Sequence, residues 1–167
     1  WDQVRTALDH VEEKTGKKFG DPKKPLLVSC RSGAKFSMPG MMDTVLAIGL
    51  YHEVAEELAV MAGDEFFAYD SYRRLIQMFG SVVLGNPDEP YEEILEEFRT
   101  KTGVATDAEL STESLQALVE RFLEITPRFP SDPMAHLKLA VEAVFKSWSG
   151  KRAVDLSSVT MDDADAA

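Results

Sequence analysis

The residues best suited to chemistry lie in a polar stretch, residues 31–44, between two apolar runs at 25–30 and 45–48. Apolar runs on both sides of a loop with glycine and proline predict a strand, a polar loop and a second strand. Glycine lets the backbone approach a ligand closely, and successive N–H groups can face an anion. Arg31 adds a permanent charge whose planar fork matches phosphate oxygens. The stretch therefore has the parts of an anion-binding loop.

The same stretch also has a simpler interpretation. It lacks the glycine–lysine–hydroxyl ending of a Walker loop and the fingerprint of dinucleotide-binding folds. A tight surface hairpin with a solvated arginine explains its composition equally well, because glycine and serine are common in turns. Met38, Met41 and Met42 either pack the loop or form an apolar wall for a flat ring, which a polarisable thioether permits. From the residues alone, both pairs of alternatives stay open.

The runs that flank this loop indicate how its first residue is aimed. Side chains of a strand alternate between two faces, so Val28 and Cys30 share a face that can be buried. Arg31 then lies on the opposite face at the mouth of the loop, partly solvated or paired with a carboxylate such as Asp43. Residues 43–50 are short and partly β-branched, which favours a second strand over a helix. We expect Cys30, the single cysteine, to be a buried small hydrophobe.

The rest of the chain shows helical spacing of apolar residues, with glycine or proline breaks between the segments. Ser111 and Asp132 are predicted N-caps, the second with a proline at the first helical position. The strongest apolar stripe is predicted to be core, with Arg73 and Arg74 largely off it, and it comprises Tyr69, Tyr72, Ile76, Phe79 and Val83. Helices are predicted over residues 1–15, 51–62, 64–84, 89–102, 112–125 and 133–149.

Composition excludes several function classes. The formal net charge is −11 with a pI near 4.7, which argues against binding to nucleic acid or to an anionic membrane. No apolar run is long enough to cross a bilayer. His10 and His136 are expected to be solvated, because no second histidine or acidic cluster supports a ligand role, and His52 has no evident partner either. The last helix is expected to turn Met134, Leu137, Val141, Val144, Phe145 and Trp148 inward.

Several runs of the sequence together carry a family resemblance. They include Ser37-Met38-Pro39-Gly40-Met41-Met42-Asp43-Thr44, and further runs at residues 17–21, 25–29, 31–34, 67–79, 129–130 and 143–148. These runs closely resemble the pyruvate, phosphate dikinases, and the resemblance extends to about Val154. The Ser-Met-Pro-Gly-Met-Met-Asp-Thr run also separates the chain from phosphoenolpyruvate synthases and glucan, water dikinases.

The resemblance implies a fold and a domain organisation. The expected fold class is α+β, predominantly helical: a partial ATP-grasp nucleotide-binding subdomain with a short β-hairpin, carrying an inserted helical-bundle subdomain. Residues 1–50 and 129–154 would belong to the nucleotide-binding subdomain, and residues 51–128 to the inserted helical subdomain with a core of its own. Residues 155–167 are expected to form an acidic, flexible tail.

The resemblance also implies an activity. Members of the family convert ATP, pyruvate and phosphate to AMP, phosphoenolpyruvate and pyrophosphate with magnesium, through phosphorylation of a histidine on a separate domain. None of the three histidines here lies in a matching motif. By resemblance, Arg31 is a catalytic, ATP-contacting arginine, and the other residues expected to contact ATP are Ser32, Met41, Met42, Asp43 and Thr44. No metal ligand is assigned within this chain.

The resemblance implies that this chain carries only part of a site. The family's nucleotide-binding lysine would precede Trp1, and its magnesium-binding and ATP-binding acids and glutamine would follow Ala167. We therefore expect a cytoplasmic, homodimeric full-length enzyme and an inactive isolated chain. The alternative is a non-catalytic helical interaction module derived from a dikinase. A reading frame that continues past Ala167 into a phosphohistidine domain would favour the enzyme over the module.

Overall fold

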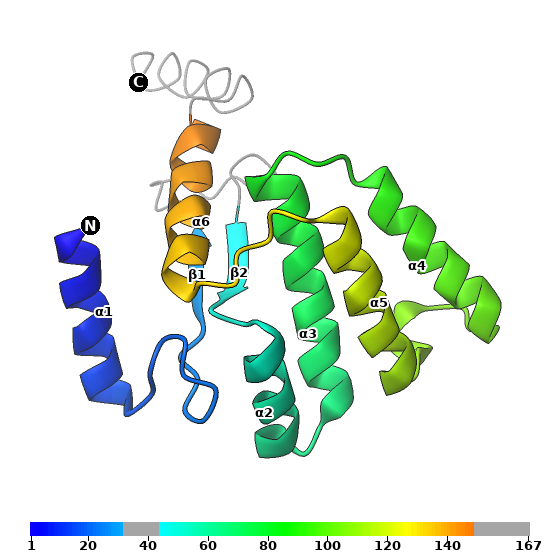
Figure 1. Ribbon diagram of the computed structural model, residues 1–167, viewed down its shortest axis with the longest axis horizontal. Helices are drawn as coiled ribbons and strands as arrows, with labels where there is room; N and C mark the ends of the chain where they lie inside the picture. The colour runs from blue at the N-terminus through cyan, green and yellow to red at the C-terminus, as the bar shows by residue number, and fades with distance from the viewer. Residues whose placement is uncertain (32–43, 149–167) are drawn as a thin grey trace, which may run out of the picture.

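A computed structural model describes residues 1–31 and 44–148, and within them six α-helices accompany one short two-stranded sheet (Figure 1). The predicted, mostly helical α+β class with a β-hairpin is confirmed. The ATP-grasp assignment and the domain boundaries stay predictions. In chain order the elements are α1 (Asp2–Thr15), β1 (Val28–Arg31), β2 (Thr44–Ile48), α2 (His52–Ala62), α3 (Glu65–Met78), η1, a π-helix (Phe79–Val83), α4 (Glu89–Thr102), η2, a 3-10 helix (Asp107–Glu109), α5 (Thr112–Ile125) and α6 (Pro133–Trp148).

The hairpin pairs β1 with β2 in antiparallel register, with Arg31 opposite Thr44. Along β1 the half-buried Val28 and Cys30 alternate with exposed neighbours, as a strand with one covered face requires. The predicted faces of this strand are therefore confirmed. Cys30 was predicted to be buried, but it is only half-buried. Its partial burial raises the pKa of the thiol.

The helix boundaries follow local capping signals. The Ser111 hydroxyl accepts the N–H of Ser114 at 3.2 Å, and the Asp132 carboxylate accepts the N–H of Ala135 at 2.7 Å. Both predicted N-caps are confirmed. Such side chains satisfy N–H groups that the first turn of a helix leaves without a partner. Most observed helices begin and end within a residue of the predicted ones because these signals are local. The helix predicted over residues 64–84 is an exception, since its α-helical part ends at Met78 and a π-helix continues over Phe79–Val83.

One buried cluster joins the hairpin and the helices. The predicted stripe of α3 and η1 supplies Tyr72, Ile76 and Phe79, each at most 2% exposed. The same cluster contains Val45 from β2, four residues of α5 and Leu137 from α6. Helix α3 lies between β2 on one side and α5 on the other, with α2 beside its first half (Figure 1). Packing against α3 therefore positions the hairpin relative to the other helices.

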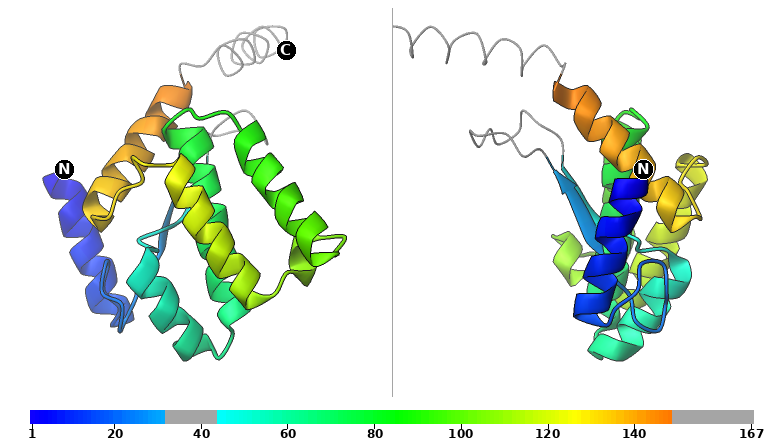
Figure 2. Two further views of the ribbon diagram at one scale, coloured as in Figure 1. Left: turned by 45° about the vertical axis from the view of Figure 1, so that its right-hand side comes forward. Right: turned by 90° about the vertical axis from the view of Figure 1, so that its left-hand side faces the viewer.

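Helix α1 lies at the edge of the molecule, away from α3 (Figure 2). None of its residues is buried, and Trp1 is 47% exposed. Its attachments include an N–H from Phe19 to the Glu12 carboxylate at 2.8 Å and the Lys138 ammonium 5.9 Å from the Trp1 ring centroid. The half-buried Val4 also packs against the core cluster. Within residues 1–31 and 44–148, no helix has both the length and the apolarity needed to span a membrane.

The expected solvation of His136 is wrong. Its side chain is only 2% exposed, and its ring meets the rings of Phe79 and Phe129 edge-on at centroid distances of 4.5 and 5.0 Å. Nε2 has no hydrogen-bond partner in the structure, and burial lowers the pKa of the imidazole to about 4. The residue is buried because the first turns of α6 pack on η1, a contact that local sequence does not reveal.

Other expectations about single side chains also need correction. Arg73 is 3% exposed although it was placed off the core stripe, and Phe145 is 63% exposed although it was expected to face inward. Arg73 can be buried because two carboxylates pair with it. His52 was expected to have no partner, but its Nε2 lies 3.4 Å from Oε1 of Glu56. His10 is exposed as predicted.

Gly80 allows a close approach that alanine would block. The Tyr91 hydroxyl lies 2.6 Å from the Thr126 hydroxyl and accepts from Asn86 at 3.1 Å, and a Cβ on Gly80 would lie 1.9 Å from that hydroxyl oxygen. We expect Gly80→Ala to lower the free energy of unfolding by about 1–3 kcal/mol, as overpacking does. Urea unfolding of Gly80→Ala in the wild-type and Tyr91→Phe backgrounds measures this. The cost should shrink when the hydroxyl is absent, and an equal cost in both backgrounds would contradict the steric explanation.

Burial of neutral His136 predicts a loss of stability in mild acid. Its folded pKa of about 4 lies below the ordinary 6.5, so between these values the unfolded chain binds a proton that the folded chain does not. The free energy of unfolding should therefore fall as the pH drops from 6.5 to 4, by about 3 kcal/mol from this group. His136→Leu should remove that contribution, whereas the exposed-site control His10→Leu should keep it. Urea melts at pH 7, 5.5 and 4.5 test this, and parallel pH profiles for both variants would refute it.

Candidate functional site

Arg31 is the last residue of β1, and its side chain is exposed. It lies on the face of the hairpin away from Val28 and Cys30, as predicted, because side chains alternate along the strand. Its cross-strand partner Thr44 is half-buried at the start of β2. Residues directly opposite each other in an antiparallel pair have neighbouring side chains. The loop end of the hairpin therefore presents a guanidinium beside a hydroxyl.

The other predicted ATP contacts cannot be placed against this pair. Ser32, Met41, Met42 and Asp43 lie outside the described residues, as does the carboxylate suggested as a partner for Arg31. Of the six predicted residues, the structure thus brings together Arg31 and Thr44.

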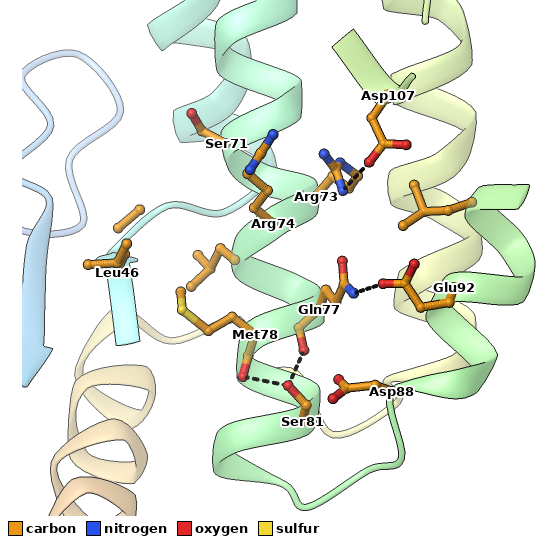
Figure 3. Close-up of a pocket in the computed structure, with 13 residues that line it drawn as sticks. Leu46, Ser71, Arg73, Arg74, Gln77, Met78, Ser81, Asp88, Glu92 and Asp107 are labelled. Carbon is orange, nitrogen blue, oxygen red and sulfur yellow. Dashed lines mark hydrogen bonds and ion pairs between the residues drawn. The ribbon is translucent and has the colours of Figure 1, made fainter. Parts of the chain in front are cut away.

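A cleft with a volume of about 610 Å³ adjoins β2 (Figure 3). Leu46 and Ala47 of β2 form one wall, and α3 forms the floor. Met78 points toward Leu46 on this side of α3, while Gln77 points the other way, toward Glu92 of α4 (Figure 3). Its remaining lining residues are Ser71, Arg73, Arg74, Leu75, Ser81, Asp88, Leu95 and Asp107. The cleft begins two residues along β2 from Thr44.

The charges along the cleft are unevenly distributed. Arg73 is neutralised by Asp70 and by Asp107, whose Oδ2 lies 3.5 Å from Nη1. Asp107 also accepts from Arg99 at 2.6 Å. Arg74 shares Asp70, donating from Nε at 2.7 Å, but is 65% exposed. The solvent-facing positive charge of the cleft therefore comes from Arg74.

The far wall of the cleft is acidic and tied to α3. Gln77 donates to Glu92 at 3.0 Å, and Asp88 lines the same side. An anionic ligand would be repelled there and attracted to the side formed by Arg74 and β2. Among the described residues, no group of three or more His, Cys, Asp or Glu side chains is arranged to hold a metal ion. The described part of the cleft can therefore recognise a polar anion but offers no metal centre.

Sequence reasoning missed the place of Arg74 beside the hairpin. Its position off the apolar stripe showed that it would avoid the core, and its adjacency to Arg73 gave no way to tell the paired arginine from the exposed one. The distinction depends on Asp107, which arrives from η2. The available signal was the run of two arginines inside a segment that resembles the dikinases.

The chain was compared with known proteins, and no family model matches it. It is 46% identical over 164 residues to a chloroplastic pyruvate, phosphate dikinase of Flaveria trinervia, covering 95% of this chain. It is 46% identical over 159 residues to a pyruvate, phosphate dikinase of Entamoeba histolytica and 47% identical over 157 residues to one of Giardia intestinalis, covering 92% and 91% of this chain. The chain spans only 17–18% of the length of these relatives. Over nine-tenths of its length, this chain is thus homologous to one segment of the pyruvate, phosphate dikinases, as its motifs predicted.

Proposed function

We propose that this chain is part of the ATP-binding domain of a pyruvate, phosphate dikinase and supplies phosphate contacts for transfer of a phosphoryl group to a histidine on another domain. The observation that carries the proposal is the exposed guanidinium of Arg31 at the loop end of the hairpin, beside Thr44. Phosphoryl transfer depends on alignment and on neutralising charge more than on covalent chemistry. An arginine fixed at the end of a strand meets both needs.

The surroundings of Arg31 support this role. Its strand is held by the half-buried Val28 and Cys30, so the last residue starts from a fixed backbone. The Thr44 hydroxyl can donate to a phosphate oxygen, and Arg74 adds a second exposed positive charge beside β2. The chain as a whole has a net charge of −11, so these local cations, and not the overall charge, would attract an anion.

The proposed enzyme would use ATP and magnesium and would make AMP, phosphoenolpyruvate and pyrophosphate from ATP, pyruvate and phosphate. We assign no magnesium ligand to the described residues, because they offer no cluster of suitable side chains. The partners proposed for this chain are the other domains of the dikinase, including the phosphohistidine domain, in a homodimer. A cytoplasmic location stays a prediction, and the names of several relatives mark them as chloroplastic.

Replacing Arg31 tests the proposal directly. In a full-length dikinase that contains this segment, we expect Arg31→Ala to reduce phosphohistidine formation from labelled ATP by about 10²–10³-fold, as for loss of one preorganised electrostatic contact. Arg31→Lys should fall between Arg31→Ala and the wild type, because lysine keeps the charge but not the fork. Thermal stability should change little, since Arg31 is exposed and contributes little packing.

Arg121 provides a matched control for this experiment. It is 50% exposed on α5 and paired with Glu124 at 3.1 Å, far in sequence from the hairpin. Arg121→Ala should leave phosphorylation unchanged. Normal phosphorylation in Arg31→Ala would reject the phosphate-contact role and favour the interaction module. Lost activity with a collapsed melting temperature would instead make Arg31 a structural residue.

The isolated chain is expected to lack dikinase activity. Phosphoryl transfer tolerates little misplacement of the reacting groups, and the described residues provide cations but no metal-binding cluster. A coupled assay for phosphoenolpyruvate with purified chain, ATP, phosphate, pyruvate and magnesium should stay at background. The matched control is the full-length protein at equal concentration, and turnover by the isolated chain above background would overturn this expectation.

A further inference from the structure

The hairpin contains an irregularity next to the candidate site. Val28 pairs with Ile48 and Cys30 pairs with Val45, so one residue of β1 lies opposite two residues of β2, Leu46 and Ala47. Two residues opposite one define a β-bulge, which bends a strand and redirects its side chains. Both residues of the bulge also line the cleft beside Arg74.

Ala47 adopts a conformation that its side chain disfavours. Its φ is +55°, and it is the sole residue other than glycine with a positive φ in the described part of the chain. In the left-handed region the Cβ crowds the backbone, so glycine or asparagine is the usual occupant. A strained residue persists only where its surroundings force the conformation, and such residues cluster at functional sites.

The surroundings of Ala47 do force it. Val45 and Ile48 are both 0% exposed and both belong to the core cluster, although they are three positions apart. In a regular strand, residues three apart face opposite sides, so one of the two would face solvent. The extra residue resets the alternation, and the Ala47 carbonyl then accepts the N–H of the buried Leu50 at 3.1 Å.

The same reset decides what the outward face presents. With Val45 buried opposite Cys30, Thr44 and Arg31 form the next pair and face away from the core. Leu46 is 51% exposed on that outer side. If the bulge were lost while Ile48 stayed opposite Val28, the pairing would slip by one residue. Arg31 would then lie opposite Val45, and Val45 would leave the core.

We propose that Ala47 is a positioning residue: its left-handed conformation sets the strand register that holds Arg31 beside Thr44 on the outward face, in position for the phosphates of ATP. The inference rests on the proposed role of Arg31 in phosphate binding. Ala47 itself acts through β2 and need not touch the nucleotide. Substitutions at this position should therefore rank by their tolerance of a positive φ and not by size or polarity alone.

The single cysteine makes the register measurable in the purified chain. Directly opposed residues of an antiparallel pair are close enough to form a disulfide, and residues one step out of register point to opposite faces. With Val45→Cys, mild oxidation should link Cys30 to position 45, whereas Leu46→Cys should not link. Ala47→Gly and Ala47→Asn should preserve this pattern. Valine is β-branched and tolerates a positive φ poorly. Ala47→Val should therefore weaken the disulfide when combined with Val45→Cys and should allow one to form when combined with Leu46→Cys.

The functional consequence is measured in a full-length dikinase that contains this segment. Ala47→Val should reduce phosphohistidine formation by roughly 100-fold, the scale of a misplacement of about 1 Å, with no further loss when combined with Arg31→Ala. Ala47→Gly and Ala47→Asn should stay near the wild-type rate. Activity that follows the tolerance of each residue for a positive φ would not be expected if Ala47 only filled space, because glycine and asparagine differ from alanine in size.

The outcomes separate the two proposals. Normal phosphorylation in Arg31→Ala, with crosslinks that shift as expected, would reject the role of Arg31 and leave the bulge assignment standing. Crosslinking of Ala47→Val at position 45, or its normal phosphorylation beside an inactive Arg31→Ala, would overturn the positioning role. If Ala47→Val does not fold, the glycine variant decides: it should melt at or above the wild-type temperature and crosslink at position 45. A lower melting temperature without that crosslink would overturn the proposal.

Discussion

Burial of α3 on several sides is the constraint on which the described structure depends. Its apolar stripe, with Tyr72 and Ile76, faces the common core, and α2, α5 and β2 all pack on the helix. Each large apolar side chain removed from water contributes about 1.5–3 kcal/mol. Packing on α3 stabilises the hairpin, because two strands alone are at best marginally stable in water. The candidate site is therefore positioned by a helix that follows it in the sequence, and its geometry depends on that packing.

The position of Arg73 within this helix imposes a second requirement. A buried guanidinium with no partner would destabilise the fold by about 3–5 kcal/mol, so burying Arg73 requires carboxylates on both sides of it. Asp70 comes from the same helix, and Asp107 comes from η2, which also binds Arg99 of α4. These pairs connect α3 to the segment that follows α4. They also pair the charge of Arg73 inside the fold, whereas Arg74, which shares Asp70, keeps an exposed side chain at the cleft.

Local signals explain which parts of the structure could be predicted. The N-caps at Ser111 and Asp132 satisfy backbone groups within three residues, and the alternation that exposes Arg31 needs only the strand itself. His136 was mispredicted because its burial depends on Phe129, which precedes α6, and on Phe79, which lies far from it in the sequence. The fold class was therefore accessible from the sequence, and the pairing of buried polar groups was not.

The bulge at Leu46 and Ala47 could be predicted only in part. Nothing in the residue types of Leu46 and Ala47 marks an irregular strand, since alanine is an unusual choice for a positive φ. The available sign was the spacing of Val45 and Ile48, two apolar residues three apart within a short strand. Such spacing fits a helix as well as a bulged strand, and only the pairing with β1 distinguishes the two. Of the site, the face of Arg31 was predictable, and the register that aligns it with Thr44 was not.

Because α1 is attached only loosely, its local stability is lower than that of the core around α3. A helix with no buried residue, whose contacts are a side-chain hydrogen bond, a cation–π contact and the packing of half-buried Val4 against the core cluster, can unfold without opening the core. An isolated helix of its 14 residues is marginal in water, so its backbone amides should exchange with solvent by local fraying. The amides of α3 can exchange only when the whole cluster opens. Hydrogen exchange would therefore divide the chain into a slowly exchanging centre built on α3 and a first helix that samples the coil while the rest stays folded.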